Sequence, residues 1–91
     1  EIHHLPTKDQ RSLFNEITEA AEFLEKDVQP AKINIGAIGN IVPQLHVHLV
    51  SRKSDDAAWP NPVWGHSSPV NYKNSEAIQI IKKIKRNFTK V

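Results

Sequence analysis

Two histidines, His46 and His48, lie one residue apart within the apolar segment QLHVHLV at positions 44–50. Successive side chains of a β-strand point to opposite faces, so in a strand Gln44, His46 and His48 share one face, about 6.5–7 Å apart. An imidazole with a free pKa near ~6.5 is either a neutral nucleophile or a charged acid near neutral pH. One ring of a pair can attack phosphorus while the other donates a proton, which is the chemistry of phosphoryl or nucleotidyl transfer.

Spacing alone leaves two other interpretations open. Two histidines on the solvent-exposed face of a sheet often have no function, and a His-x-His pair on a strand can also chelate zinc. A third zinc ligand could come from His3, His4 or His66, but no motif fixes the distance of these residues from the pair. His3 and His4 precede a helix start and are expected at the surface, and His66 has no assigned role.

An amphipathic helix is predicted over residues 8–27, ahead of the histidines. Thr7 is expected to cap it, with Gln10 at the capping-box position. Its apolar stripe recurs every three or four residues, at Leu13, Ile17, Ala20 or Ala21, Leu24 and Val28.

The histidines themselves are predicted to lie on the second strand of an antiparallel hairpin. Alternation predicts strands over 31–37 and 44–51, joined by a loop over 38–43. The face opposite the histidines, formed by Leu45, Val47 and Leu49, is expected to pack against a helix. The glycine-containing stretch 36–40 precedes the histidines, and its backbone N–H groups could approach an anion closely.

The remaining chain supplies a surface segment and a second helix. Residues 53–72 are rich in Pro, Ser, Asn and Asp, and are expected to be irregular and anchored by Trp59, Trp64 and Tyr72. A second helix is predicted after Ser75, with a stripe at Ala77, Ile80 or Ile81, Ile84 and Phe88. Two strands and two helices make a poor independent domain. We therefore expect further strands from a preceding segment or from a second copy of the chain.

Composition limits the classes of protein to consider. The chain has 91 residues, enough for one domain. It has no cysteine, which excludes disulfides, a thiolate nucleophile and Cys-ligated metals, and fits a cytoplasmic location. No apolar stretch approaches the ~20 residues that span a bilayer, so no membrane association is expected. Residues 1–30 hold seven acids and three bases, whereas residues 31–91 hold three acids and nine bases. A basic half can bind an anionic ligand or simply be a solvated helix face.

The stretch KINIGAIGNIVPQLHVHLVSR, residues 32–52, resembles the histidine-triad (HIT) family, whose motif is His-φ-His-φ-His-φ-φ, with φ apolar. The following DDAAWPNPVWG, residues 55–65, is similar to a bacterial branch described as diadenosine-tetraphosphate-hydrolase-like. The resemblance covers about residues 1–65. It implies an α+β fold with an antiparallel sheet of about five strands, here a partial, C-terminal portion with about two strands and two helices. Residues 1–91 are then a single, incomplete HIT-like domain, and 66–91 a C-terminal extension with a basic helix.

The resemblance also implies roles for individual residues. His46 matches the nucleophile that forms a covalent nucleotidyl-histidine, and His48 matches the histidine that contacts phosphate oxygens and helps the leaving group. Asn34 matches a polar residue that contacts the ligand. Gly39, with Asn40 beside it, matches the loop whose backbone N–H groups meet phosphate. No metal or other cofactor is required by that chemistry.

The chain departs from the family pattern at three points. Gln44 stands where the first histidine of the triad is expected, and an amide can hydrogen-bond but cannot titrate. Ile41 stands where a phosphate-contacting Ser or Thr often lies, and the loop is one residue shorter. The first strands of the family fold, which build the nucleoside pocket, are absent, so we expect this chain to be the C-terminal part of a longer protein.

Three hypotheses of function follow. The first is a hydrolase or transferase that acts on a nucleotide or dinucleoside polyphosphate, as a homodimer. The second is a catalytically weak nucleotide-binding module with an incomplete triad. The third is a protein whose basic helix, residues 75–91, binds nucleic acid or an acidic partner.

Overall fold

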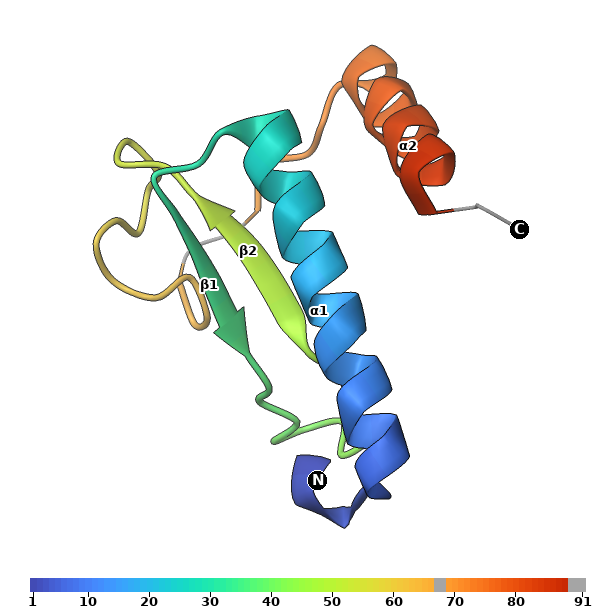
Figure 1. Cartoon of the computed structure of the whole chain (residues 1–91). Coiled ribbons are helices and arrows are strands. Elements are labelled where there is room, and N and C mark those ends of the chain that lie inside the picture. The colour runs from blue at the N-terminus through green and yellow to red at the C-terminus, as the bar shows by residue number, and fades with distance from the viewer. Residues whose placement is uncertain (67–68, 89–91) are drawn as a thin grey trace.

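The computed structural model describes residues 1–66 and 69–88 of the chain. The elements follow in the order η1 (Ile2–His4, a short 3-10 helix), α1 (Thr7–Val28), β1 (Lys32–Gly36), β2 (His48–Arg52) and α2 (Asn74–Phe88) (Figure 1). Two antiparallel strands and two helices confirm the partial α+β fold expected from the sequence. The last three residues of the predicted basic segment, 89–91, lie outside the described residues.

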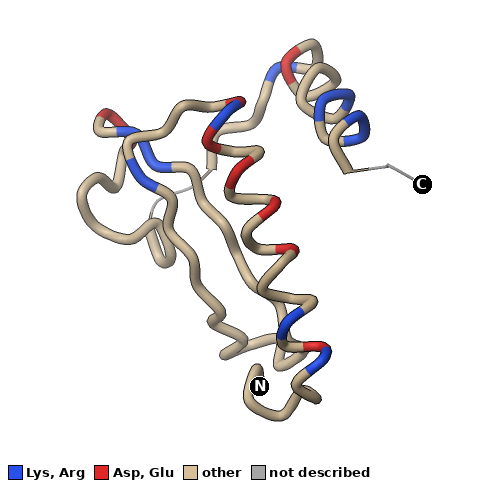
Figure 2. Tube along the Cα trace, in the orientation of Figure 1, with Lys and Arg blue, Asp and Glu red and all other residues tan. Residues whose placement is uncertain are grey.

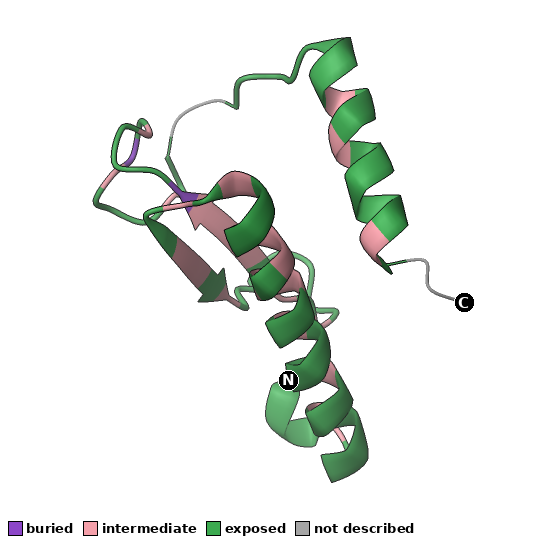
Figure 3. Ribbon diagram, turned by 45° about the horizontal axis from the view of Figure 1, so that its top comes forward, coloured by how far each residue is buried: buried purple, intermediate pink, exposed green. Residues whose placement is uncertain are grey.

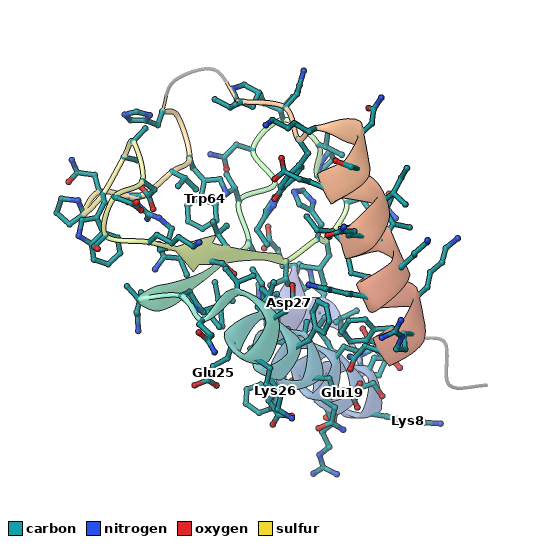
Figure 4. The ribbon with its side chains drawn as sticks, turned by 90° about the horizontal axis from the view of Figure 1, so that it is seen from above. Lys8, Glu19, Glu25, Lys26, Asp27 and Trp64 are labelled. Atoms are coloured by element: carbon teal, nitrogen blue, oxygen red, sulfur yellow. The ribbon has the colours of Figure 1, made fainter. Side chains whose placement is uncertain are left out.

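The hairpin confirms the predicted antiparallel pairing and fixes its register. The cross-strand pairs are Lys32–Arg52, Ile33–Ser51, Asn34–Val50, Ile35–Leu49 and Gly36–His48. Directly paired residues of an antiparallel ladder share one face of the sheet. His48, Asn34 and Arg52 therefore lie on the same face. Leu49 lies on the opposite face, where it lines a groove with Phe23 of α1. Viewed from above, α1 covers one side of the hairpin and Trp64 lies on the other (Figure 4).

Helix α1 confirms the predicted helix to within one residue at each end, but the predicted cap is wrong. The backbone N–H groups of Asp9 and Gln10 both donate to the carbonyl oxygen of Pro6, at 2.9 and 3.0 Å. The helix therefore starts at Pro6, which holds the capping position without a side-chain hydrogen bond, and Thr7 is its first helical residue. The side-chain amide of Gln10 donates instead to the carbonyl oxygen of Leu5, at 2.9 Å.

The second strand is shorter than predicted, because it begins at His48 and not at residue 44. Strand β1 ends at Gly36, the residue that pairs with His48. Residues 44–47 therefore extend past the end of β1, and in the described part of the chain they have no ladder partner. An alternating pattern indicates which side chains could share a face, but only a partner strand makes the segment a strand. The connection between the strands thus runs over residues 37–47.

The described residues bury little apolar surface. Only Ala58 and Arg52 are buried among them, with 6% and 2% of their surface exposed. Exposed residues dominate both helices (Figure 3). This agrees with the expectation that a single hairpin with two helices forms only part of a core.

Helix α2 contacts α1 near its C-terminal end and begins at Asn74, one residue before the predicted cap. The rings of Phe23 and Phe88 meet edge to face, with centroids 5.3 Å apart. Lys83 donates to Asp27 in a salt bridge of 3.0 Å. Acidic residues are spaced along α1, and basic residues gather on α2 (Figure 2). The charge asymmetry of the sequence is therefore an asymmetry between the two helices. Within residues 1–66 and 69–88, no helix is long and apolar enough to cross a membrane.

Candidate active site

The rings of His46 and His48 are in contact at the start of β2. Their centroids are 5.0 Å apart and their planes meet at 82°, an edge-to-face arrangement. Both side chains are exposed. His48 is fixed by the ladder opposite Gly36, whereas His46 lies on the connection before the strand. The structure thus brings together the two histidines that the sequence singled out, with His46 outside the strand predicted to carry it.

The tautomer of His46 follows from its hydrogen bond. Its Nδ1 lies 2.7 Å from the backbone carbonyl oxygen of Gln44. A carbonyl oxygen can only accept, so Nδ1 must carry the proton and donate it. In the neutral ring, Nε2 is then unprotonated and keeps its lone pair available for an electrophile. The contact orients the ring and selects the tautomer that a nucleophile needs.

A small hollow beside His46 collects further residues of the predicted site. Gly39, Gln44 and His46 line it, together with Glu1 and the neighbouring loop residues Ala37, Ile38, Pro43 and Leu45. Its volume is about 50 Å³, far below the ~300–1,000 Å³ of ordinary ligand pockets. Gly39 has a φ of 61°, a left-handed conformation in which glycine carries no steric penalty. Asn40 is exposed and does not line the hollow.

Trp64 packs against the second histidine on the face of the sheet that lies away from α1. Its ring centroid is 6.1 Å from that of His48, with the planes at 73°. The same indole covers Gly36, since a Cβ built on this glycine would lie 3.0 Å from Trp64 Cη2. A side chain at position 36 would therefore require the indole to shift by a few tenths of an ångström. From the sequence, Trp64 was expected to anchor a loop, with closure over a ligand or a dimer partner as the alternative.

A buried arginine, which was not predicted from the sequence, holds the segment that carries Trp64. The Arg52 guanidinium donates through Nε and Nη2 to both carboxylate oxygens of Asp56, at 2.7 and 3.0 Å. Nη1 donates to Asn34 Oδ1 and Nη2 to the backbone oxygen of Asn61, each at 2.7 Å. The guanidinium carbon also lies 5.5 Å from the centre of the Trp59 ring. The available signal was an arginine at the end of an apolar strand with a carboxylate four residues further on.

This network also places Asn34, which was predicted to contact the ligand. Asn34 lies on the histidine face of the sheet, and its amide oxygen accepts the hydrogen bond from Arg52. Its amide nitrogen is the group that remains able to donate to another partner. Among residues 1–66 and 69–88, no three His, Cys, Asp or Glu side chains are grouped so that they could hold a metal ion.

The Arg52–Asp56 pair predicts a specific dependence of stability on pH. Hydrogen bonding from Arg52 is the main cause that lowers the pKa of Asp56 from 3.8 to about 2, and the backbone N–H groups of Ala58 and Trp59 add to it. A carboxylate whose pKa is lowered by folding stabilises the folded state above its unfolded pKa. The free energy of unfolding should therefore fall as pH drops from about 4 to about 2.

Urea denaturation at a series of pH values checks this prediction. Asp56→Asn should show a shallower fall in the free energy of unfolding over that interval, because it removes the group that titrates. The exposed neighbour Asp55 provides a matched control, and Asp55→Asn should keep the wild-type slope. Equal slopes for wild type and Asp56→Asn would contradict the assignment.

The described fold and site define a small α+β protein with a histidine pair at the start of a strand. The sequence model of the HIT domain matches residues 1–55 of the chain. The chain therefore belongs to the HIT family. A search of curated proteins found no match.

Three solved structures of HIT proteins are similar to this chain. A histidine triad protein from Bradyrhizobium japonicum has a TM-score of 0.91 and 40% sequence identity, over 96% of this chain and 65% of its own. A histidine triad protein from Sinorhizobium meliloti has a TM-score of 0.88 and 40% identity, over 97% of this chain and 65% of its own. One from Marinobacter aquaeolei has a TM-score of 0.88 and 37% identity, over 96% and 64%. The chain spans about two thirds of the length of each.

Proposed function

We propose that the protein binds nucleotides and hydrolyses or transfers them at the α-phosphate, through a covalent nucleotidyl-histidine on His46. The observation that carries this proposal is the hydrogen bond from His46 Nδ1 to the carbonyl oxygen of Gln44, because it leaves Nε2 with a free lone pair. Membership of the HIT family and the contact with a second imidazole support it.

The reaction has two balanced steps. In the first, His46 Nε2 attacks the α-phosphorus, a P–N bond forms, and the P–O bond to the leaving group breaks. The oxygen of the leaving group takes a proton from His48. In the second, water attacks the phosphorus, the P–N bond breaks and its electron pair returns to Nε2, while the proton of the water passes to His48. A single phosphate can contact both rings, because their centroids are only 5.0 Å apart.

The small hollow has room for a phosphate group of the substrate but not for its nucleoside. A volume of about 50 Å³ matches a phosphate-sized group and not a nucleoside. We propose that Gly39 and its neighbours approach a phosphate through backbone N–H groups, with Asn40 at the edge of this loop. The nucleoside then binds outside this hollow. A dinucleoside polyphosphate and a homodimer are the substrate and assembly that this proposal favours, with residues 66–91 as a C-terminal extension.

A catalytically weak binding module is the second candidate, and Gln44 is the observation that favours it. Gln44 replaces the first of the three rings of a complete triad, and its amide side chain cannot titrate. A nucleotide that binds without turnover in the full-length protein would select this candidate. The basic helix α2 offers a third candidate, but Lys83 already pairs with Asp27. A salt-dependent shift of RNA or DNA would be required to support it.

The Gln44 side chain is expected to matter less than its position in the motif suggests. His46 Nδ1 donates its hydrogen bond to the backbone carbonyl oxygen of residue 44. A side-chain substitution at this position keeps that oxygen, provided that the backbone path is unchanged. Gln44→Ala should therefore change kcat by less than about tenfold, since a single peripheral hydrogen bond is at stake. Steady-state kinetics of Gln44→Ala and Gln44→His check this. A rise of several hundredfold in Gln44→His would show that the missing ring limits catalysis.

A further inference from the structure

Arg52 joins three separate parts of the chain on the face of the sheet that carries His48. Its side chain donates hydrogen bonds to Asn34 on β1, to the Asp56 carboxylate and to the backbone of Asn61. With 2% of its surface exposed, it is the most buried side chain described. A buried guanidinium requires this number of partners, because an unpaired buried charge is strongly unfavourable.

The segment 53–65 begins and ends at opposite ends of β2. It leaves the strand directly after Arg52, and its residue Trp64 contacts His48, the first residue of the strand. At the usual rise per residue these two ends are about 13 Å apart. The segment must therefore run back across the face of the sheet, and Arg52 bonds it at two points on the way, Asp56 and Asn61.

Asp56 stabilises the first of these two points. Besides the guanidinium, its carboxylate accepts the backbone N–H groups of Lys53 and Ala58, at 3.3 and 3.1 Å. Ala58 is itself buried, and the ring of Trp59 lies near the guanidinium. The turn after β2 is thus built around the side chain of Arg52.

At the end of segment 53–65, Trp64 contacts His48 and covers the glycine that pairs with it. Trp64 occupies the space above Gly36, the cross-strand partner of His48. Any displacement of segment 53–65 over the sheet therefore moves the indole relative to the imidazole.

We propose that Arg52 is a positioning residue of the candidate active site: it fixes segment 53–65 across the sheet so that Trp64 holds the ring of His48. The kinetic part of this inference rests on the proposed function, whereas the geometric part does not. The planar fork of arginine donates in three directions at once, which the single ammonium group of lysine cannot reproduce.

Proton NMR of the His48 ring tests the geometric part without any substrate. The ring protons of His48, assigned with His48→Gln, sense the ring current of the nearby indole. Trp64→Leu therefore gives their chemical shifts in the absence of the indole. In Arg52→Lys, the chemical shifts should change most of the way to the values in Trp64→Leu. Arg11→Lys, at an exposed arginine of α1, is the matched control and should leave them unchanged.

Two further variants keep the inference falsifiable if Arg52→Lys does not fold. Asp56→Asn should shift the His48 resonances in the same direction. Gly36→Ala, which leaves the arginine network intact, should also shift them, because its methyl group would lie 3.0 Å from Trp64 Cη2 and displace the indole slightly. Folded variants at Arg52 or Asp56 with wild-type His48 resonances and only a lower melting temperature would overturn the inference.

Kinetics of the full-length protein then separate this inference from the proposed function. Arg52→Lys should lower kcat by up to about 10²-fold, the scale of a small misplacement of a catalytic group. It should cause little further loss in the Trp64→Leu background, because both changes act through the same indole. Shifted resonances in a protein without turnover would support the positioning role and contradict the proposed function. Additive losses in the double variant would overturn the role of Trp64 as the link.

Discussion

Replacement of His46 by alanine is expected to lower kcat/KM for a dinucleoside polyphosphate or a nucleoside phosphoramidate by at least about 10⁴-fold, because it removes the nucleophile. The loss should fall on kcat, since the phosphate still meets His48 and the loop around Gly39. A coupled assay or chromatography of the released nucleotide measures it. We expect this effect to be larger than that of His48→Ala, because His46 is the histidine that lines the hollow in the described part of the chain.

The control for His46→Ala is another exposed histidine. His4 lies in the short helix η1, and His4→Ala should retain kcat/KM within about twofold, as expected for an exposed side chain that does not line the hollow beside His46. Equal, slow hydrolysis by wild type and His46→Ala would show that the pair is not a catalytic site. Loss of activity in His4→Ala as well would point to a folding effect and not to chemistry.

Replacement of His48 by alanine is expected to lower kcat by about 10²–10⁴-fold, the usual contribution of a general acid. The effect should depend on the leaving group, which distinguishes His48 from the nucleophile. A leaving group that departs as a stable anion, such as para-nitrophenolate, does not need a proton. In His48→Ala, the first-turnover release of para-nitrophenolate from a nucleotide ester should therefore be almost as fast as in wild type, whereas steady-state turnover also needs His48 to accept the proton of the water.

A comparison of His46→Ala and His48→Ala with both substrates distinguishes the nucleophile from the general acid. His46→Ala should fail with the para-nitrophenyl ester and with the dinucleoside polyphosphate alike. In the first turnover, His48→Ala should be slow only with the dinucleoside polyphosphate. If His48→Ala slows the first turnover of both substrates by the same factor, His48 binds the phosphate and does not deliver a proton to the leaving group.

The helices and the hairpin could be predicted because each depends on a local pattern. The stripe from Leu13 to Val28 repeats with the helical period, and the observed helix α1 differs from the predicted one by a single residue at each end. The start of β2 could not be predicted in this way. The alternation from Gln44 onward is continuous in the sequence, but the ladder stops where Gly36 ends β1.

In the candidate site, too, the features that depend on local sequence could be predicted, and those that depend on the fold could not. The pairing of His46 with His48 follows from their spacing in any extended chain, and their contact is observed. The tautomer of His46 depends on a backbone oxygen two residues away, which no residue type reveals. Arg52 was missed because its partners are 4, 9 and 18 residues distant along the chain, and only the fold brings them to one guanidinium.

Rapid-quench mass spectrometry detects the covalent intermediate proposed on His46 directly. The full-length protein is mixed with the nucleotide substrate, quenched in alkali within the first turnover, digested, and the peptide that contains both histidines is sequenced by fragmentation. We predict the added mass of one nucleoside monophosphate, less water, on His46, with no such adduct in His46→Ala. Formation of product in the first turnover with an unmodified His46, or an adduct on His48 instead, would show that His46 is not the nucleophile.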